Sequence, residues 1–190
     1  MAELFKPIDT QNLDWNRSNW AQKTSSVRAE HVPANTPITT RMKDGHIETQ
    51  NTSKEGDVLV TNPSGEQYLV GQEKFNARYD QRGDVFTPKA APVEVMAIRE
   101  NVSFKAPWGE EMKIKAGGVL VKAGENDVYG IQKEEFHETY DVLKVERGAT
   151  KETATKAAEK TLAIKAAAMS KIQPPTQTAA TSRENNQDQR

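Results

Sequence analysis

The side chains best suited to chemistry occur as three pairs, each at matching positions of two similar stretches of the sequence. They are Tyr68 and Tyr129, Asp80 and Asp141, and Glu66 and Asp127. A tyrosine offers a ligand both a ring and a hydroxyl group, and a carboxyl group can accept hydrogen bonds or transfer a proton. We predict that these six residues contact a ligand, and that Glu66, set against Asp127 in the matching turn, is the acid of any catalytic site.

Two of these pairs also have a structural interpretation. Tyr68 and Tyr129 lie in predicted strands, where their rings can simply pack in the core. Asp80 and Asp141 follow predicted short helices, where a carboxylate opposes the helix dipole. A structural role for these aspartates would be to accept hydrogen bonds from backbone N–H groups of the next turn.

The two similar stretches are residues 56–80 and 117–141, GDVLVTNPSGEQYLVGQEKFNARYD and GGVLVKAGENDVYGIQKEEFHETYD. Aligned without a gap, they agree at 9 of 25 positions. Unrelated segments of average composition match at roughly one or two positions over such a length. Repetition of this extent indicates a duplicated structural unit.

Each copy predicts a strand, a turn, a second strand and a short helix. The strands are short β-branched runs, and the helices place an aromatic pair four residues apart on one face. A further hairpin is predicted in the first copy at Asp44-Gly45, because both central residues of the tightest hairpin turn need a positive φ. The second copy has Pro107-Trp108-Gly109 at the comparable place. The fold class is therefore α+β, mainly β.

We divide the chain into an N-terminal arm, two β-rich modules, a helix and a tail. Their ranges are 1–22, 23–88, 89–147, 148–172 and 173–190. Modules of roughly 55 to 60 residues have marginal cores. We therefore expect the two modules to pack on each other as a pseudo-twofold pair and to leave a cleft at their joint.

The N-terminal arm carries two tryptophans, Trp15 and Trp20. Large apolar rings seldom stay in water, so one interpretation docks both indoles onto the following domain. The other is that they bind a partner. Residues 149–172 are rich in Ala, Lys and Glu, which predicts a helix that covers the modules or assembles the protein as a homo-oligomer. Residues 173–190 lack core-forming side chains and are predicted to be disordered.

Composition excludes several classes of function. The 190 residues carry a formal net charge of -1, which gives no basis for expecting nucleic-acid binding. There is no cysteine, so disulfides and thiolate chemistry are excluded. The N-terminus does not resemble a secretory signal, and no apolar run is long enough to span a membrane. We expect a cytoplasmic protein with no membrane association.

The sequence lacks the common motifs of hydrolases and of phosphate-binding loops. Glu134 and His137 have metal-ligand spacing, but the matching place in the first copy holds Glu73 and Asn76. A carboxylate-bridged site uses such a pair twice. We therefore predict no metal and no cofactor.

The paired stretches resemble the PGDYG-type module, a short β-rich unit found in bacterial and phage proteins. The shared pattern is a glycine and an aspartate before two aliphatic residues, a turn with glycine, an aromatic strand, and a helix that ends in Phe and Tyr. Gly56-Asp57 keeps the Gly-Asp of the motif, whereas Gly117-Gly118 lacks the aspartate. The resemblance covers roughly residues 23–146 and implies a compact, mainly β fold without implying an activity.

Three functions remain open. The first is a non-enzymatic binding protein whose joint or termini contact a protein or small-molecule partner. The second is an enzyme with a Tyr/carboxylate site at the joint, acting on a nucleotide or a sugar. The third is a structural subunit assembled through the C-terminal helix. A clustered, partly buried carboxyl pair in a real pocket would favour the enzyme.

Overall fold

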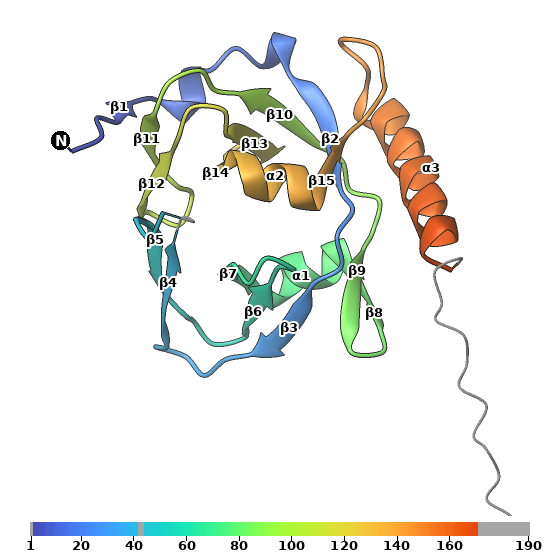
Figure 1. Cartoon of the computed structure of the whole chain (residues 1–190), viewed down its shortest axis with the longest axis horizontal. Helices are drawn as coiled ribbons and strands as arrows, with labels where there is room; N and C mark the ends of the chain where they lie inside the picture. Colours follow the sequence, from blue (N-terminus) through green and yellow to red (C-terminus); the bar gives the residue numbers. More distant parts are fainter. Residues whose placement is uncertain (1, 42–43, 171–190) are drawn as a thin grey trace, which may run out of the picture.

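The computed structural model describes residues 2–41 and 44–170 of the chain. It confirms the predicted class: most elements are antiparallel strands, and three α-helices accompany them. In Figure 1 the second half of the chain lies above the first, with two hairpins on the left and the C-terminal helix on the right. None of the helices in this part of the chain is both long and apolar enough to cross a bilayer. The predicted tail, 173–190, lies outside the described residues.

The first half is built on the antiparallel order β3-β6-β7. Its elements are β3 (Arg28–His31), β6 (Asp57–Thr61), β7 (Gln67–Gly71), α1 (Gln72–Arg78), β8 (Tyr79–Arg82) and β9 (Val85–Pro88). A bridge from Val27 to Phe86 joins β9 to the start of β3. The core contains Val58, Val60 and Phe75, so the aromatic residue predicted for the inner helix face is buried there.

The second half repeats this order. Its elements are β10 (Val93–Ala97), β13 (Val119–Gly124), β14 (Asp127–Ile131), α2 (Lys133–Thr139) and β15 (Tyr140–Val142). They form one five-stranded sheet, β14-β13-β10-β2-β15, in which β2 (Asn19–Lys23) comes from the N-terminal arm. The core contains Val95, Val121 and Phe136. Both predicted short helices are therefore present, each directly after its pair of strands.

The two halves differ in the strand that completes them. In the first half, β9 follows β8 and lies beside the start of β3. In the second half, β2 lies between β10 and β15, with Ala21 paired to Val93 and to Val142. Ala21 is fully buried. A segment from the start of the chain thus forms the interior of a sheet whose other strands lie more than 70 residues later.

Two hairpins extend from the halves. The first consists of β4 (Pro37–Arg41) and β5 (Ile47–Thr52), and the second of β11 (Val102–Lys105) and β12 (Glu111–Ile114), with β1 (Lys6–Pro7) parallel to β11. The hairpin predicted at Asp44-Gly45 is confirmed, and Gly45 has a φ of 89°. Strand β5 lies against β12, so the hairpins also connect the two halves (Figure 1).

The second hairpin explains why the second copy lacks the motif aspartate. Ile114 of β12 is fully buried against β13 and β14. A Cβ atom at Gly118 would lie 2.5 Å from Ile114 Cγ2, which no side chain could tolerate without movement. Gly118 is the counterpart of Asp57, whose side chain is only partly buried in the first half. Close hairpin packing therefore excludes the aspartate.

Both arm tryptophans contact the second half. Trp15 packs against the cluster that contains Phe104 and Ile114. Trp20 packs against Leu143 and the C-terminal helix, and its Nε1 donates a hydrogen bond of 3.0 Å to the carbonyl of Ala149. The helix α3 (Lys151–Ser170) matches the predicted one, and buries Ala154 and Ala158 on this side. The arm thus docks on the protein, as the structural interpretation of its indoles predicted, but on the second half and not on the module that directly follows the arm.

Candidate functional site

The joint between the halves is organised reciprocally. The helix of each half faces the turn that follows the central strand of the other. Lys74 of α1 contacts Asp127 beside the β13–β14 turn, and Glu135 of α2 contacts Asn62 and Ser64 in the β6–β7 turn. Lys74 and Glu135 occupy matching positions in the two copies. The joint therefore has two ends built from equivalent positions.

Four tyrosines fill the middle of the joint, and we call them the tyrosine core. They are Tyr68, Tyr79, Tyr129 and Tyr140. The hydroxyl groups of Tyr129 and Tyr140 lie 3.5 Å apart, and the ring centroids of Tyr68 and Tyr79 lie 5.2 Å and 5.6 Å from Lys23 Nζ. Burial raises the pKa of Tyr79 to about 12, and also raises the pKa values of Tyr68 and Tyr140. These phenols stay protonated at neutral pH.

One lysine from the N-terminal arm enters this core. Lys23 Nζ donates hydrogen bonds of 2.7 Å to Tyr68 Oη and 3.0 Å to Asn62 Oδ1. It lies over the rings of Tyr68 and Tyr79. Burial of the ammonium group lowers the pKa of Lys23 to about 8, although the charges of Glu66 and Glu135 oppose this shift. The arm therefore supplies the cation nearest to the acidic end of the joint.

The first end of the joint, the ion-pair end, joins opposite charges. Lys74 Nζ lies 3.1 Å from Asp127 Oδ2, and Arg78 Nη2 lies 3.8 Å from the same oxygen. Lys74 and Arg78 both belong to α1, four residues apart, so they reach the same side of the helix. This end has the ordinary composition of an interface between two units of one chain.

The other end gathers three glutamates, which we call the carboxyl cluster: Glu48 of β5, Glu66 of the β6–β7 turn and Glu135 of α2. Asn62 Nδ2 donates to Glu66 Oε2 at 2.9 Å and to Glu135 Oε1 at 2.7 Å. The charges of Glu48 and Glu135 also act directly on Glu66. Carboxyl groups this close repel each other unless one of them carries a proton.

The surroundings of the cluster favour that proton. Burial, followed by the charges of Glu135 and Glu48, raises the pKa of Glu66 to about 8. Burial also raises the pKa of Glu48 to about 7, although a hydrogen bond of 3.2 Å from Gln132 Nε2 partly opposes the shift. Glu48 and Glu135 are 5% and 7% exposed. The cluster therefore retains protons at pH values where exposed carboxyl groups are fully ionised.

The carboxyl cluster opens into a cleft of about 630 Å³ between the halves, which we call the joint cleft. Its walls come from β4, β5, the β6–β7 turn and the start of α2, and nearly all its lining side chains are polar. Arg41, Lys115 and Lys133 add positive charge around the acids. Lys115 is already paired with Asp44 and, at 2.9 Å, with Glu3.

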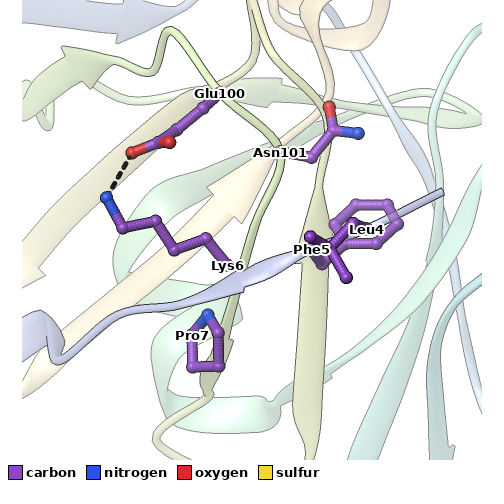
Figure 2. Close-up of a pocket in the computed structure, with 6 residues that line it drawn as sticks. All are labelled: Leu4, Phe5, Lys6, Pro7, Glu100 and Asn101. Carbon is purple, nitrogen blue, oxygen red and sulfur yellow. Dashed lines mark hydrogen bonds and ion pairs between the residues drawn. The ribbon is translucent and has the colours of Figure 1, made fainter.

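A second cavity, about 440 Å³, lies beside β1 and is lined by Leu4, Phe5, Lys6, Pro7, Glu100 and Asn101. Figure 2 shows Lys6 and Glu100 reaching toward each other there, and their ion pair measures 2.8 Å. The two side chains are 63% and 59% exposed. An ion pair this exposed to water contributes little. The joint cleft, with its buried acids, is the better candidate site.

The structure separates the six predicted site residues. Glu66 lines the joint cleft, whereas Asp127 lies in the ion-pair end. Tyr68 and Tyr129 do converge at the joint, in the tyrosine core. Asp80 and Asp141 do not have the backbone N–H partners that their structural interpretation predicted. They contact the ammonium groups of Lys89 at 3.5 Å and Lys165 at 2.9 Å instead.

Sequence reasoning missed Glu48, Glu135, Asn62 and Lys23. One signal for Glu135 was present. The two copies have opposite charges at this position, with Lys74 in the first and Glu135 in the second. Glu48 had no such signal, because it lies in a hairpin where the copies do not align. Within residues 2–41 and 44–170, no group of three or more Asp, Glu or His side chains is arranged to hold a metal ion.

The fold and the cleft thus define an α+β, mainly β protein with a polar site between two similarly built halves. Residues 49–141, from β5 to β15, match the model of a family described as PGDYG protein. The matched segment includes Glu66 and Glu135 and ends with the second copy of the repeated stretch. Comparisons with curated proteins and with solved structures found no match.

Proposed function

We propose that this protein is a non-enzymatic binding protein whose joint cleft holds a small polar ligand. The observation that carries the proposal is the carboxyl cluster. Placing three glutamates together in a partly buried site lowers the stability of the fold. A positively charged residue at the position of Glu135 would restore that stability. The ion-pair end has that opposite charge in Lys74. Groups that destabilise a fold are most often kept where they act on a ligand.

The cleft has the size and the lining that such a ligand needs. Its volume of about 630 Å³ falls within the range of small-molecule sites, about 300–1,000 Å³. Hydrogen-bonding side chains from both halves line it, among them Thr40, Gln67 and Gln132. A ligand in the cleft would touch both halves at once and hold them in one arrangement. Binding would therefore raise the melting temperature of the whole protein.

The proposal includes the origin of the two halves. We infer that they are tandem PGDYG-type units in a bacterial or phage protein of the cytoplasm. The matching strand order and the reciprocal contacts of the two helices support a duplication. The two ends of the joint would then have had the same residues at first. The carboxyl cluster would have arisen later, at one end only.

A thermal-shift screen with a metabolite library tests the proposal. A ligand of the cleft should raise the melting temperature of the wild-type protein and lose this effect in Glu66→Gln. Asp80→Asn is the matched control, because Asp80 is an acid outside the cleft and its variant should respond like the wild type. Failure of the library to stabilise the protein, or equal stabilisation of Glu66→Gln, would count against a cleft ligand.

One observation favours a second function, an acid–base enzyme acting on a nucleotide or sugar. A carboxyl group whose pKa is raised to about 8 can donate a proton at neutral pH, as Glu66 can. However, glycoside hydrolysis needs two catalytic carboxyl groups with room for the sugar between them, about 5 Å or more apart, whereas a single atom, Asn62 Nδ2, donates to both Glu66 and Glu135. Binding therefore ranks first. Turnover of a cleft ligand that disappears in Glu66→Gln would reverse this order.

A further inference from the structure

The ion-pair end shows what a carboxylate at this place in the joint binds. Asp127 and Glu66 are counterparts in the two copies, and so are Lys74 and Glu135. At the ion-pair end, the helix supplies a primary ammonium group, Lys74 Nζ, which lies 3.1 Å from the Asp127 carboxylate. The molecule therefore contains one occupied example of the arrangement, with the ammonium held on an alkyl stem.

At the other end, the ammonium group is replaced by a carboxyl group. Glu135 stands where the lysine would be, and a third acid, Glu48, has been added from the β4–β5 hairpin. The ammonium group of Lys23 donates its hydrogen bonds to Tyr68 and Asn62, and its charge also interacts with Glu66 and Glu135. The cluster therefore has three carboxyl groups, and these acids outnumber the single ammonium group of Lys23 beside them.

Access distinguishes the two ends. The carboxyl cluster lies on a cleft of about 630 Å³, so a molecule from solution can reach it. The cations on the cleft wall do not supply the ammonium group that Lys74 supplies at the ion-pair end. Lys115 is paired with Asp44 and Glu3, and Arg41 donates to the carbonyl of Gly45 at 3.1 Å. Lys133 lies at the start of α2, and the carbons of its side chain pack beside Gly117.

We infer that the joint cleft binds a primary ammonium group on an unbranched alkyl stem, with its nitrogen between Glu48, Glu66 and Glu135. This inference rests on the proposed function and names its ligand class. An ammonium group has three N–H donors and would satisfy oxygens of all three glutamates, replacing a proton of the cluster. Its stem would leave through the polar mouth of the cleft. The ammonium group belongs either to a free alkylamine or to the side chain of a lysine in a peptide.

Isothermal titration of the full-length protein at pH 7.5 tests this inference. The probes are 1,4-diaminobutane and a lysine blocked at both its α-amino and carboxyl groups, with 1-butanol as the uncharged control. We expect both amines to bind and 1-butanol not to bind. Titration in phosphate and in HEPES should give different heats, because each bound ammonium releases a proton from the cluster to the buffer. Tighter binding of one amine identifies the source.

Two variants locate the site. Glu66→Gln should weaken amine binding at least about tenfold and abolish the proton release, since it removes the central charge. Glu135→Lys places in the cleft the ammonium group that Lys74 supplies at the ion-pair end. It should raise the melting temperature and exclude the probes. Lys74→Gln, the matched control, changes only the ion-pair end and should bind amines like the wild type.

The outcomes separate this inference from the proposed function. Absence of amine binding, or binding unchanged in Glu66→Gln, would overturn the ammonium site. If the metabolite screen still found another ligand sensitive to Glu66→Gln, the binding function would stand without its ammonium class. If no ligand of any class depended on Glu66, both would fall.

Discussion

The two ends of the joint occupy equivalent positions and have opposite electrostatic character. At the ion-pair end, Lys74 and Arg78 neutralise Asp127. At the cleft end, Glu135 adds a negative charge to Glu66 and Glu48, and their protons compensate for it. The comparison shows that the fold determines which positions meet. The residue at each position then determines whether the contact stabilises the joint or leaves a group able to bind something else.

A second difference separates the halves themselves. The first half is completed by β9, its own next strand, while the second depends on β2 from the start of the chain. The same arm brings Lys23 into the tyrosine core. The cleft end of the joint is thus coupled to the N-terminal arm, and the four predictions below test how far each half depends on such distant contacts.

Removing residues 1–23 should have the largest effect. The second half would lose the strand between β10 and β15, so β15 would be left without its partner and the edge of β10 would be exposed. We expect the amides of β13 to lose their protection from hydrogen exchange, and a peptide of residues 1–23 added in trans to restore it. Unchanged protection of β13 in the truncated protein would show that β2 is dispensable.

Raising the pH should destabilise the protein between about pH 4.5 and pH 8. The pKa values of Glu48 and Glu66 are raised from 4.5 to about 7 and about 8. The folded protein therefore binds more protons than the unfolded chain in this range, and unfolding becomes easier as the pH rises, by up to a few kcal/mol. Lys23, whose pKa is lowered from 10.5 to about 8, has the opposite effect from about pH 8 to 10.5.

Melting temperatures measured from pH 5 to pH 10 should accordingly pass through a minimum near pH 8. Glu66→Gln should flatten the fall on the acidic side, because a neutral amide does not titrate. Asp80→Asn, outside the cluster, should keep the wild-type profile. A wild-type melting temperature that is constant over this range would contradict the geometry of the carboxyl cluster.

Gly118→Ala should destabilise the protein by about 1–3 kcal/mol, the usual cost of overpacking a core. The new Cβ would lie against Ile114 Cγ2. The matched change in the first half, Asp57→Ala, removes only a hydrogen bond of 2.8 Å from the Lys54 N–H and should cost about 1 kcal/mol or less. Urea unfolding of both variants measures the difference. Equal losses of unfolding free energy in the two variants would mean that the second hairpin does not pack more tightly at Gly118 than the first half does at Asp57.

Lys74→Gln should have the smallest effect. Lys74 is 62% exposed, and an ion pair between exposed groups contributes little, so we expect a loss of about 0.5 kcal/mol. The loss should decrease further in 1 M salt because of screening. A loss above about 2 kcal/mol would show that the ion-pair end holds the joint together much more strongly than an exposed contact can.

Prediction from sequence succeeded where the evidence was local. Most strands, the short helices after them, the Asp44-Gly45 hairpin and the C-terminal helix were expected within a few residues, whereas β1, β2 and β8 were not expected. The site was predicted only in part. Glu66 lines the expected cleft, but Tyr68 and Tyr129 lie in the tyrosine core and Asp127 forms an ion pair. Glu48 and Lys23 were missed, because each is brought to the joint by a segment outside the repeated stretch.

The amino-acid sequence alone determined the elements and their repetition, because helix, strand and turn preferences depend on neighbours within a few residues. The tertiary structure decided which side chains meet across the joint. Glu48, Glu66 and Glu135 come from a hairpin, a turn and a helix, and their charges interact only because the two halves pack against each other. The insertion of β2 between β10 and β15 has the same cause, since a strand pairs with any free edge that the packed chain presents to it.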